Sequence, residues 1–88
     1  MKAVMFYQLS PDGMRLAVEH FPGHRARLLE FQSRGLCFMA GPFADPSQGA
    51  MGIFASREAA EEFMAEDPFI LHGVVAHREI REWKEGIA

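Results

Sequence analysis

The chain has 88 residues, 49% of them hydrophobic, and a formal net charge of −3. This length fits a single domain over residues 1–88 with one hydrophobic core, and the composition is that of a globular rather than a disordered chain. Lysine and arginine are scattered along the chain. They form no basic face, so we expect no nucleic-acid partner.

Cysteine content and hydropathy indicate the compartment. Cys37 is the only cysteine, which excludes an internal disulfide bond and suits a reducing environment. The apolar run at the amino end is too short for a signal peptide, and no apolar stretch approaches the roughly 20 residues of a membrane-spanning helix. We therefore expect a soluble, cytoplasmic protein that does not bind membranes.

Four short segments have the composition of strands and are bounded by turn residues. They cover residues 3–9, 36–41, 50–55 and 74–83. The first three are apolar on both alternating faces, which indicates strands covered on two sides. In the fourth, Ile80 and Trp83 break simple alternation, and a β-bulge or an early strand end would explain this.

Proline and glycine divide the region between the first two strands. Residues 14–20 predict a short helix, and Pro22 and Gly23 interrupt its continuation. Proline favours the first position of a helix, so a second helix is predicted from Pro22 to about Arg34. Gly35 supplies the left-handed residue that ends it.

A further helix is predicted over residues 57–66, with Ser56 as its N-cap. Its glutamates form one stripe and its apolar residues another. We interpret the acidic stripe as a solvated face and not as a metal site.

Asp67-Pro68-Phe69 marks a corner after that helix. Pro68 disfavours helical geometry at Asp67 and suits the start of a new turn, and aspartate is a preferred cap just before one. Gly73 then releases the chain into the last strand. Asp67 can cap this turn, or its carboxylate can hold a partner such as His24. The two interpretations are compatible, because one oxygen can cap while the other meets an imidazole.

His24 lies in the first turn of the helix predicted from Pro22. His24, Leu28 and Phe31 are spaced i, i+4 and i+7 and share the face toward the sheet, whereas Arg25 and its polar neighbours point toward water. A lone histidine on an apolar face is either a core residue or a proton-transfer group.

The order of elements is strand, helix, strand, strand, helix, strand. This is the βαββαβ pattern of a ferredoxin-like α+β fold, with a four-stranded antiparallel sheet and both helices on one face. Strands that are apolar on both faces would leave the second face of the sheet exposed. We therefore expect a homodimer that packs through this sheet face, as in a dimeric α/β barrel.

Three segments resemble the YCII-related (YciI-like) family of the dimeric α/β-barrel superfamily. They begin at Phe21-Pro22-Gly23-His24, at Arg34-Gly35-Leu36 with Ala40-Gly41-Pro42 following, and at Ala65-Glu66-Asp67-Pro68-Phe69. The resemblance spans nearly the whole chain and implies a ferredoxin-like dimer with an active-site histidine and aspartate at His24 and Asp67. It also implies chemistry related to a dehydrochlorinase and to muconolactone isomerases.

A histidine with a carboxylate on its other ring nitrogen can abstract a proton from carbon or oxygen. Elimination or isomerisation can follow, and neither step requires a cofactor. Cys37 lies inside a predicted strand and is expected to be buried and inert. A metal site from His20, His24, His72 and Asp67 is the weaker alternative, because Pro22 separates His20 from His24.

Two functions from different classes remain open. The first is a cofactor-independent lyase or isomerase that uses His24 and Asp67 on a small cyclic or aromatic substrate. The second is a non-catalytic domain that binds a small ligand or serves as an accessory subunit. In either case we expect a pocket beside His24 that is lined by aromatic and sulfur-containing side chains: Phe38, Met39, Phe43 and Phe69.

Overall fold

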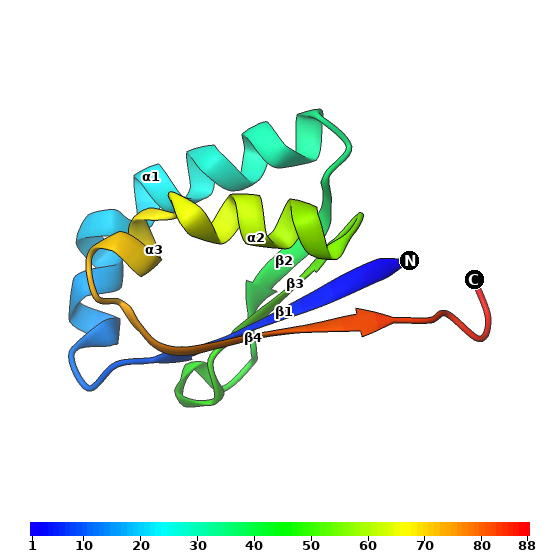
Figure 1. Ribbon diagram of the computed structural model, residues 1–88. Helices are drawn as coiled ribbons and strands as arrows, with labels where there is room; N and C mark the ends of the chain where they lie inside the picture. The colour runs from blue at the N-terminus through cyan, green and yellow to red at the C-terminus, as the bar shows by residue number, and fades with distance from the viewer.

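The structure is a computed structural model that describes residues 1–88. Its elements follow one another along the chain as β1 (Lys2–Leu9), α1 (Gly13–Ser33), β2 (Cys37–Pro42), the 3-10 turn η1 (Pro46–Gln48), β3 (Ala50–Phe54), α2 (Arg57–Ala65), α3 (Pro68–Leu71) and β4 (Val75–Trp83). The strands form one sheet in the order β2-β3-β1-β4, and every neighbouring pair is antiparallel. The helices cover one face of this sheet (Figure 1). The predicted ferredoxin-like fold is confirmed.

The hydrophobic core lies between the sheet and the helices. Alternate residues of β1, namely Ala3, Met5 and Tyr7, are buried on the helix side. Phe31 of α1 and Phe63 of α2 meet over them, with ring centroids 5.4 Å apart. The row of β1 that carries Tyr7 is therefore the one that the helices enclose.

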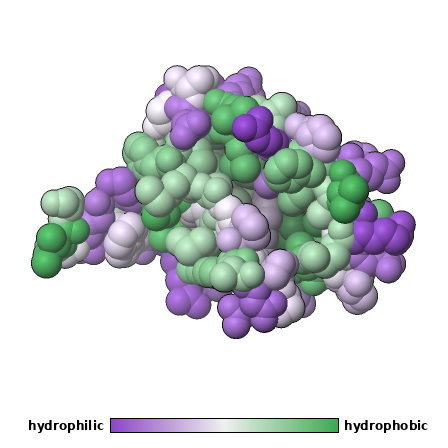
Figure 2. Space-filling model, turned by 180° about the vertical axis from the view of Figure 1, so that it is seen from behind, coloured by the Kyte–Doolittle hydropathy of each residue, from purple (hydrophilic) through white to green (hydrophobic).

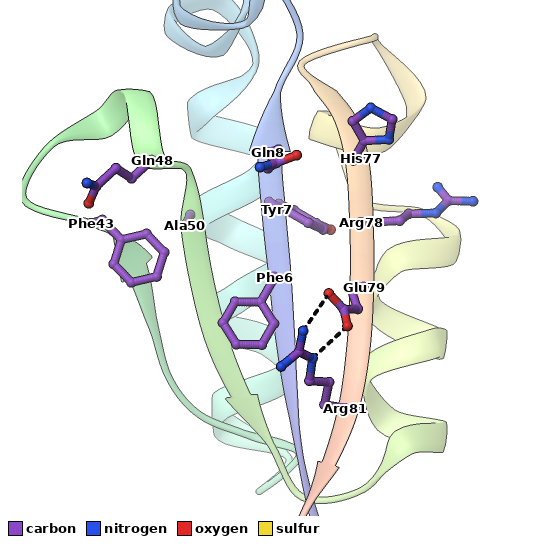
Figure 3. A pocket seen from close by; sticks show the side chains of 10 residues that line it. All are labelled: Phe6, Tyr7, Gln8, Phe43, Gln48, Ala50, His77, Arg78, Glu79 and Arg81. Atoms are coloured by element: carbon purple, nitrogen blue, oxygen red, sulfur yellow. Dashed lines mark hydrogen bonds and ion pairs between the residues drawn. The ribbon is translucent and has the colours of Figure 1, made fainter.

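The other alternate residues of β1, Val4 and Phe6, point to the face of the sheet that no helix covers. Val4 is paired with Ile53 of β3, and Phe6 lies across from Glu79 of β4. Arg81 of β4 lies with its guanidinium 5.6 Å from the centre of the Phe6 ring. This open face thus has an apolar centre and a charged border along β4 (Figure 3).

The prediction of two separate helices before β2 is wrong, because α1 is continuous and contains Pro22. Proline removes one backbone hydrogen bond, to the carbonyl of Val18, and its ring kinks the helix. The side chain of Val18 is 80% exposed, so water can reach this part of the helix. The two halves of α1 run in different directions in Figure 1. Tertiary packing of the second half outweighs the local break.

The irregularity of β4 lies at a different place from the one that the sequence indicates. Its register shifts opposite Gln8 and Leu9, before the strand reaches Ile80 and Trp83. Ile80 pairs with Met5 and faces the helices, whereas Trp83 lies on the other face of the sheet. The two residues belong to different faces, which explains their odd spacing.

No helix combines the length and the apolar character needed to cross a bilayer.

Gly49, which ends η1, is a position where only glycine fits. Its φ is +87°, and a Cβ there would lie directly against the carbonyl oxygen of Tyr7. We expect Gly49→Ala to lower the free energy of unfolding by at least about 2 kcal/mol, from backbone strain and the clash together. Gly41→Ala is the matched control, because a Cβ at Gly41 meets nothing within 4 Å. Denaturant unfolding that shows equal effects for the two variants would contradict this account.

Candidate active site

Asp67 sits in the corner between α2 and α3. Its backbone is extended, with φ −68° and ψ 123°, and its Oδ1 accepts a hydrogen bond of 3.2 Å from the backbone N–H of Phe69. Asp67 therefore caps α3, as the sequence predicts. The residue is 0% exposed, so the carboxylate is held inside the protein.

His24 approaches the same carboxylate from α1. Its Nδ1 lies 2.7 Å from Oδ1 of Asp67. A carboxylate only accepts hydrogen bonds, so Nδ1 carries the hydrogen and Nε2 is the free ring nitrogen. The capping and pairing functions that the sequence assigns to Asp67 thus coexist, and Oδ1 alone serves both.

The His24 ring is also fixed by packing. It stacks on the ring of Phe69, with centroids 3.8 Å apart and planes 2° from parallel. Phe63 meets it edge-on, with centroids 6.0 Å apart. Contacts on its face and its edge, together with the bond at Nδ1, leave the ring one orientation.

Tyr7 completes the hydrogen bonding of the carboxylate and was not predicted as a site residue. Its hydroxyl donates to Oδ2 of Asp67 over 2.7 Å. Tyr7 is the only tyrosine of the chain and belongs to the buried row of β1. A buried hydroxyl needs a hydrogen-bond partner, and this need was the only feature of the sequence that could have indicated Tyr7 as a site residue.

No lysine or arginine forms an ion pair with Asp67, and His24 is its only basic partner. The carboxylate is held by hydrogen bonds from Tyr7, His24 and the Phe69 backbone. Burial, and after it the charge of Asp67, raise the pKa of Tyr7 above its ordinary value of 10.0. The tyrosine therefore remains a hydrogen-bond donor at neutral pH.

Two further contacts bring α1 onto the corner. Arg27, one turn beyond His24, donates to the backbone carbonyls of Glu62 and Phe63 at the end of α2, over 2.7 and 2.9 Å. Gly23 lies against α3, where an added Cβ would come 3.1 Å from the ring of Pro68. The bond between His24 and Asp67 thus lies between two other contacts of α1: Gly23 packs against Pro68 of α3, and Arg27 binds the last carbonyls of α2.

A cavity of about 650 Å³ opens beside His24. Its walls come from α1, from β1, β2 and β3, and from Phe69 of α3, and most of the lining residues are hydrophobic. Figure 2 shows the side of the molecule opposite to that of Figure 1, where hydrophobic residues surround a hollow. His24 and Tyr7 are among the few polar residues of the lining.

Three of the four residues expected in a pocket beside His24 line this cavity: Phe38, Met39 and Phe69. The fourth, Phe43, lines a different cavity of about 370 Å³ on the open face of the sheet, with Phe6 (Figure 3). Pro42 pairs with Ala50 of β3, which pairs with Tyr7 of β1, so Pro42 belongs to the helix-side row, and side chains alternate between faces along an extended chain. The residue after Pro42 therefore points the other way.

The remaining histidines and the cysteine are arranged separately. His20 stacks on His72, with ring centroids 4.0 Å apart. No group of three or more histidine, cysteine or acidic side chains is placed so that it could hold a metal ion. Cys37 is buried, and burial raises the pKa of its thiol, which keeps it protonated and unreactive.

The fold and this site define a small ferredoxin-like protein in which a partly buried histidine pairs with a buried aspartate beside an apolar cavity. The chain belongs to the YCII-related family, whose domain model matches residues 1–84. A comparison with curated proteins finds no significant match.

Two solved structures share the fold. One is 5-chloro-2-hydroxyhydroquinone dehydrochlorinase (TftG) from Burkholderia phenoliruptrix AC1100, in complex with 2,5-dihydroxybenzoquinone. It has 21% sequence identity and a TM-score of 0.80, over 98% of this chain and 96% of the other. The other is protein Atu4242 from Agrobacterium tumefaciens, with 14% identity and a TM-score of 0.53, over 91% and 88% of the two chains.

The bond between Tyr7 and Asp67 predicts how the protein titrates at high pH. The pKa of Tyr7 is raised in the folded state, so its stabilising contribution is complete below the unfolded value of 10.0 and is lost as the pH rises above it. We therefore expect the absorbance of tyrosinate to appear only when the protein unfolds at high pH. A pH titration that records this absorbance together with circular dichroism, which reports unfolding, measures both. A tyrosine that titrates near 10.0 in the folded protein would contradict the buried hydrogen bond.

Proposed function

We propose that this protein is a small enzyme that uses His24 and Asp67 as an acid–base pair on a small cyclic or aromatic substrate, in a lyase or isomerase reaction. The observation that carries the proposal is the 2.7 Å bond between His24 Nδ1 and Asp67, which leaves Nε2 as the free nitrogen of a residue that lines the cavity. Such a nitrogen is an acceptor in the neutral ring.

In the proposed reaction, Nε2 removes a proton from a carbon or oxygen of the substrate. The ring becomes an imidazolium, and the Asp67 carboxylate stabilises it. In an elimination, the electron pair of the broken C–H bond forms a double bond, and the leaving group departs with its own pair. In an isomerisation, Nε2 returns the proton to another atom. Proton transfer of this kind contributes roughly 10²–10⁴-fold in rate and needs no cofactor.

The cavity supports a ring-shaped substrate. Met5 of β1 and Leu28 of α1 line the cavity on the helix side of the sheet, while the ring of Phe69 stacks on His24. The structural relative is a dehydrochlorinase and was crystallised with a benzoquinone. Loss of hydrogen chloride is an elimination, so this relative supports the reaction class and leaves the substrate open.

A non-catalytic role is the second candidate. Exposed apolar residues of α1 line the same cavity, among them Met14, Phe21 and Leu29, which are 59%, 51% and 45% exposed. A rim of this kind also suits a ligand that is bound without turnover, or a larger partner. Turnover that depends on His24 separates the two functions.

A screen of hydroxylated aromatics and lactones tests the enzyme hypothesis, with His24→Ala as the variant that should lose turnover. Asp67→Asn should lower turnover by up to about 10⁴-fold, because an amide cannot stabilise the imidazolium. It should also cost about 1–3 kcal/mol in stability, because its NH₂ faces donors that need an acceptor. This exceeds the cost of about 1 kcal/mol or less that capping alone predicts.

Asp45→Asn is the matched control, because Asp45 caps η1 with an exposed side chain. It should change neither turnover nor stability measurably. Full activity of Asp67→Asn on a substrate that requires His24 would reduce Asp67 to a cap.

We also propose that two copies associate through the open face of the sheet. Val4, Phe6 and Ile53 are half-buried there with no helix over them. The charged residues of β4 border this apolar centre, as Glu79 and Arg81 do beside Phe6 in Figure 3. Such a mixed face can be buried between two identical chains.

Light scattering at micromolar concentration should therefore give about twice the chain mass. Phe6→Glu should shift the protein to a monomer, because it would place a charge in the centre of the interface. Val18→Glu is the control, since Val18 is 80% exposed on α1 and far from the open face in the fold. A wild-type monomer, or equal effects of the two substitutions, would refute association through this face.

A further inference from the structure

Arg25 shares with Arg78 and Lys84 the lack of any ion pair or side-chain hydrogen bond, and it alone of these three lines the cavity of His24. Most of the others form ion pairs with carboxylates: Lys2, Arg15, Arg27, Arg34, Arg57 and Arg81. Arg25 forms neither an ion pair nor a side-chain hydrogen bond, although it follows His24 directly on α1. It is exposed to water, as the sequence predicts, and it also lines the cavity of His24.

The helix itself explains why Arg25 is unpaired. Side chains three and four residues away are its neighbours on the helix surface. At Arg25 these positions hold Phe21, Pro22, Leu28 and Leu29, and none of them can accept a hydrogen bond from a guanidinium. The exposed charge of Arg25 therefore stands beside apolar side chains at the edge of the cavity, where water but no carboxylate solvates it.

The rest of the cavity offers no opposite charge. Its lining includes no aspartate or glutamate, and Arg25 is the only permanently charged residue in it. Asp67 is not part of the lining, and its oxygens are occupied by Tyr7, His24 and the Phe69 backbone. An apolar cavity with one uncompensated cation favours a ligand that is apolar over most of its surface and carries a negative charge.

We infer that Arg25 is a specificity-determining residue that selects substrates with an ionised oxygen, such as a phenolate, an enolate or a carboxylate on a small ring. The inference rests on the proposed function, because it concerns the same cavity and the same base. The proton removed by His24 Nε2 leaves its electron pair on the substrate, so negative charge remains in the cavity. The positive guanidinium of Arg25 attracts that negative charge and therefore favours binding of the anion over binding of a neutral analogue.

Two probes of similar shape and different charge test this inference by calorimetry. The first is 2,5-dihydroxybenzoquinone, which is an anion at neutral pH, and the second is its neutral dimethyl ether, 2,5-dimethoxybenzoquinone. Arg25→Gln should weaken binding of the anion by about tenfold and leave binding of the ether unchanged. Arg25→Lys should retain most of the affinity, because it keeps the charge. Arg15→Gln, on the same helix and outside the cavity, is the matched control and should have no effect.

Salt gives a second readout. At about 1 M ionic strength the screening length falls to about 3 Å, so wild-type affinity for the anion should approach that of Arg25→Gln. Equal binding of the two probes by the wild type, absence of anion binding, or equal effects of Arg25→Gln and Arg15→Gln would each overturn the inference. The enzyme proposal is tested separately. If the anion binds through Arg25 but no ring compound is converted in a reaction that requires His24, the inference about Arg25 holds and the proposed enzymatic function is refuted.

Discussion

The arrangement of the site depends on the hydrogen bonds of one buried carboxylate. Asp67 joins β1 through Tyr7, α1 through His24 and α3 through the Phe69 backbone. An ionised group that is 0% exposed is tolerated inside a protein only when its hydrogen-bonding capacity is met. The three elements must therefore meet at this point, and the free nitrogen of His24 is positioned as a consequence.

The surrounding packing makes that meeting precise. Gly23 lets α1 approach Pro68, and Arg27 holds the last carbonyls of α2 just before the corner. The guanidinium of Arg27 also lies over the rings of Phe31 and Phe63, 4.8 and 5.6 Å from their centres. The contacts that fix the catalytic candidates are thus continuous with the hydrophobic core, and the corner that carries Asp67 is held between α1, α2 and α3.

The two faces of the sheet carry different features. The helix side contains the core, the carboxylate and the cavity of about 650 Å³. The open side carries an apolar centre with Phe6, a smaller cavity and the charged row of β4. Because side chains alternate along a regular stretch of strand, a shift of a single residue decides which face a side chain joins. Phe43, one residue beyond Pro42, is on the open side for this reason.

The amino-acid sequence alone determined what depends on local geometry. Pro68 and Gly73 define the corner and its release, Asp67 is the cap, and the spacing of His24 with Leu28 and Phe31 aims it at the sheet. The order of strands and helices was enough for the ferredoxin-like topology, because few topologies are compatible with that order.

Only the tertiary structure decided features that depend on distant parts of the chain. Tyr7 is 60 residues from Asp67 in sequence, and nothing local predicts their bond. The local signal at Pro22 predicts a break, and packing of α1 on the sheet overrides it at the cost of about one hydrogen bond. The role of Arg25 likewise depends on the cavity beside it, since an unpaired arginine on a helix is ordinary until the walls around it are known. Local rules act within a few residues, whereas burial and charge compensation are settled where elements from different parts of the chain meet.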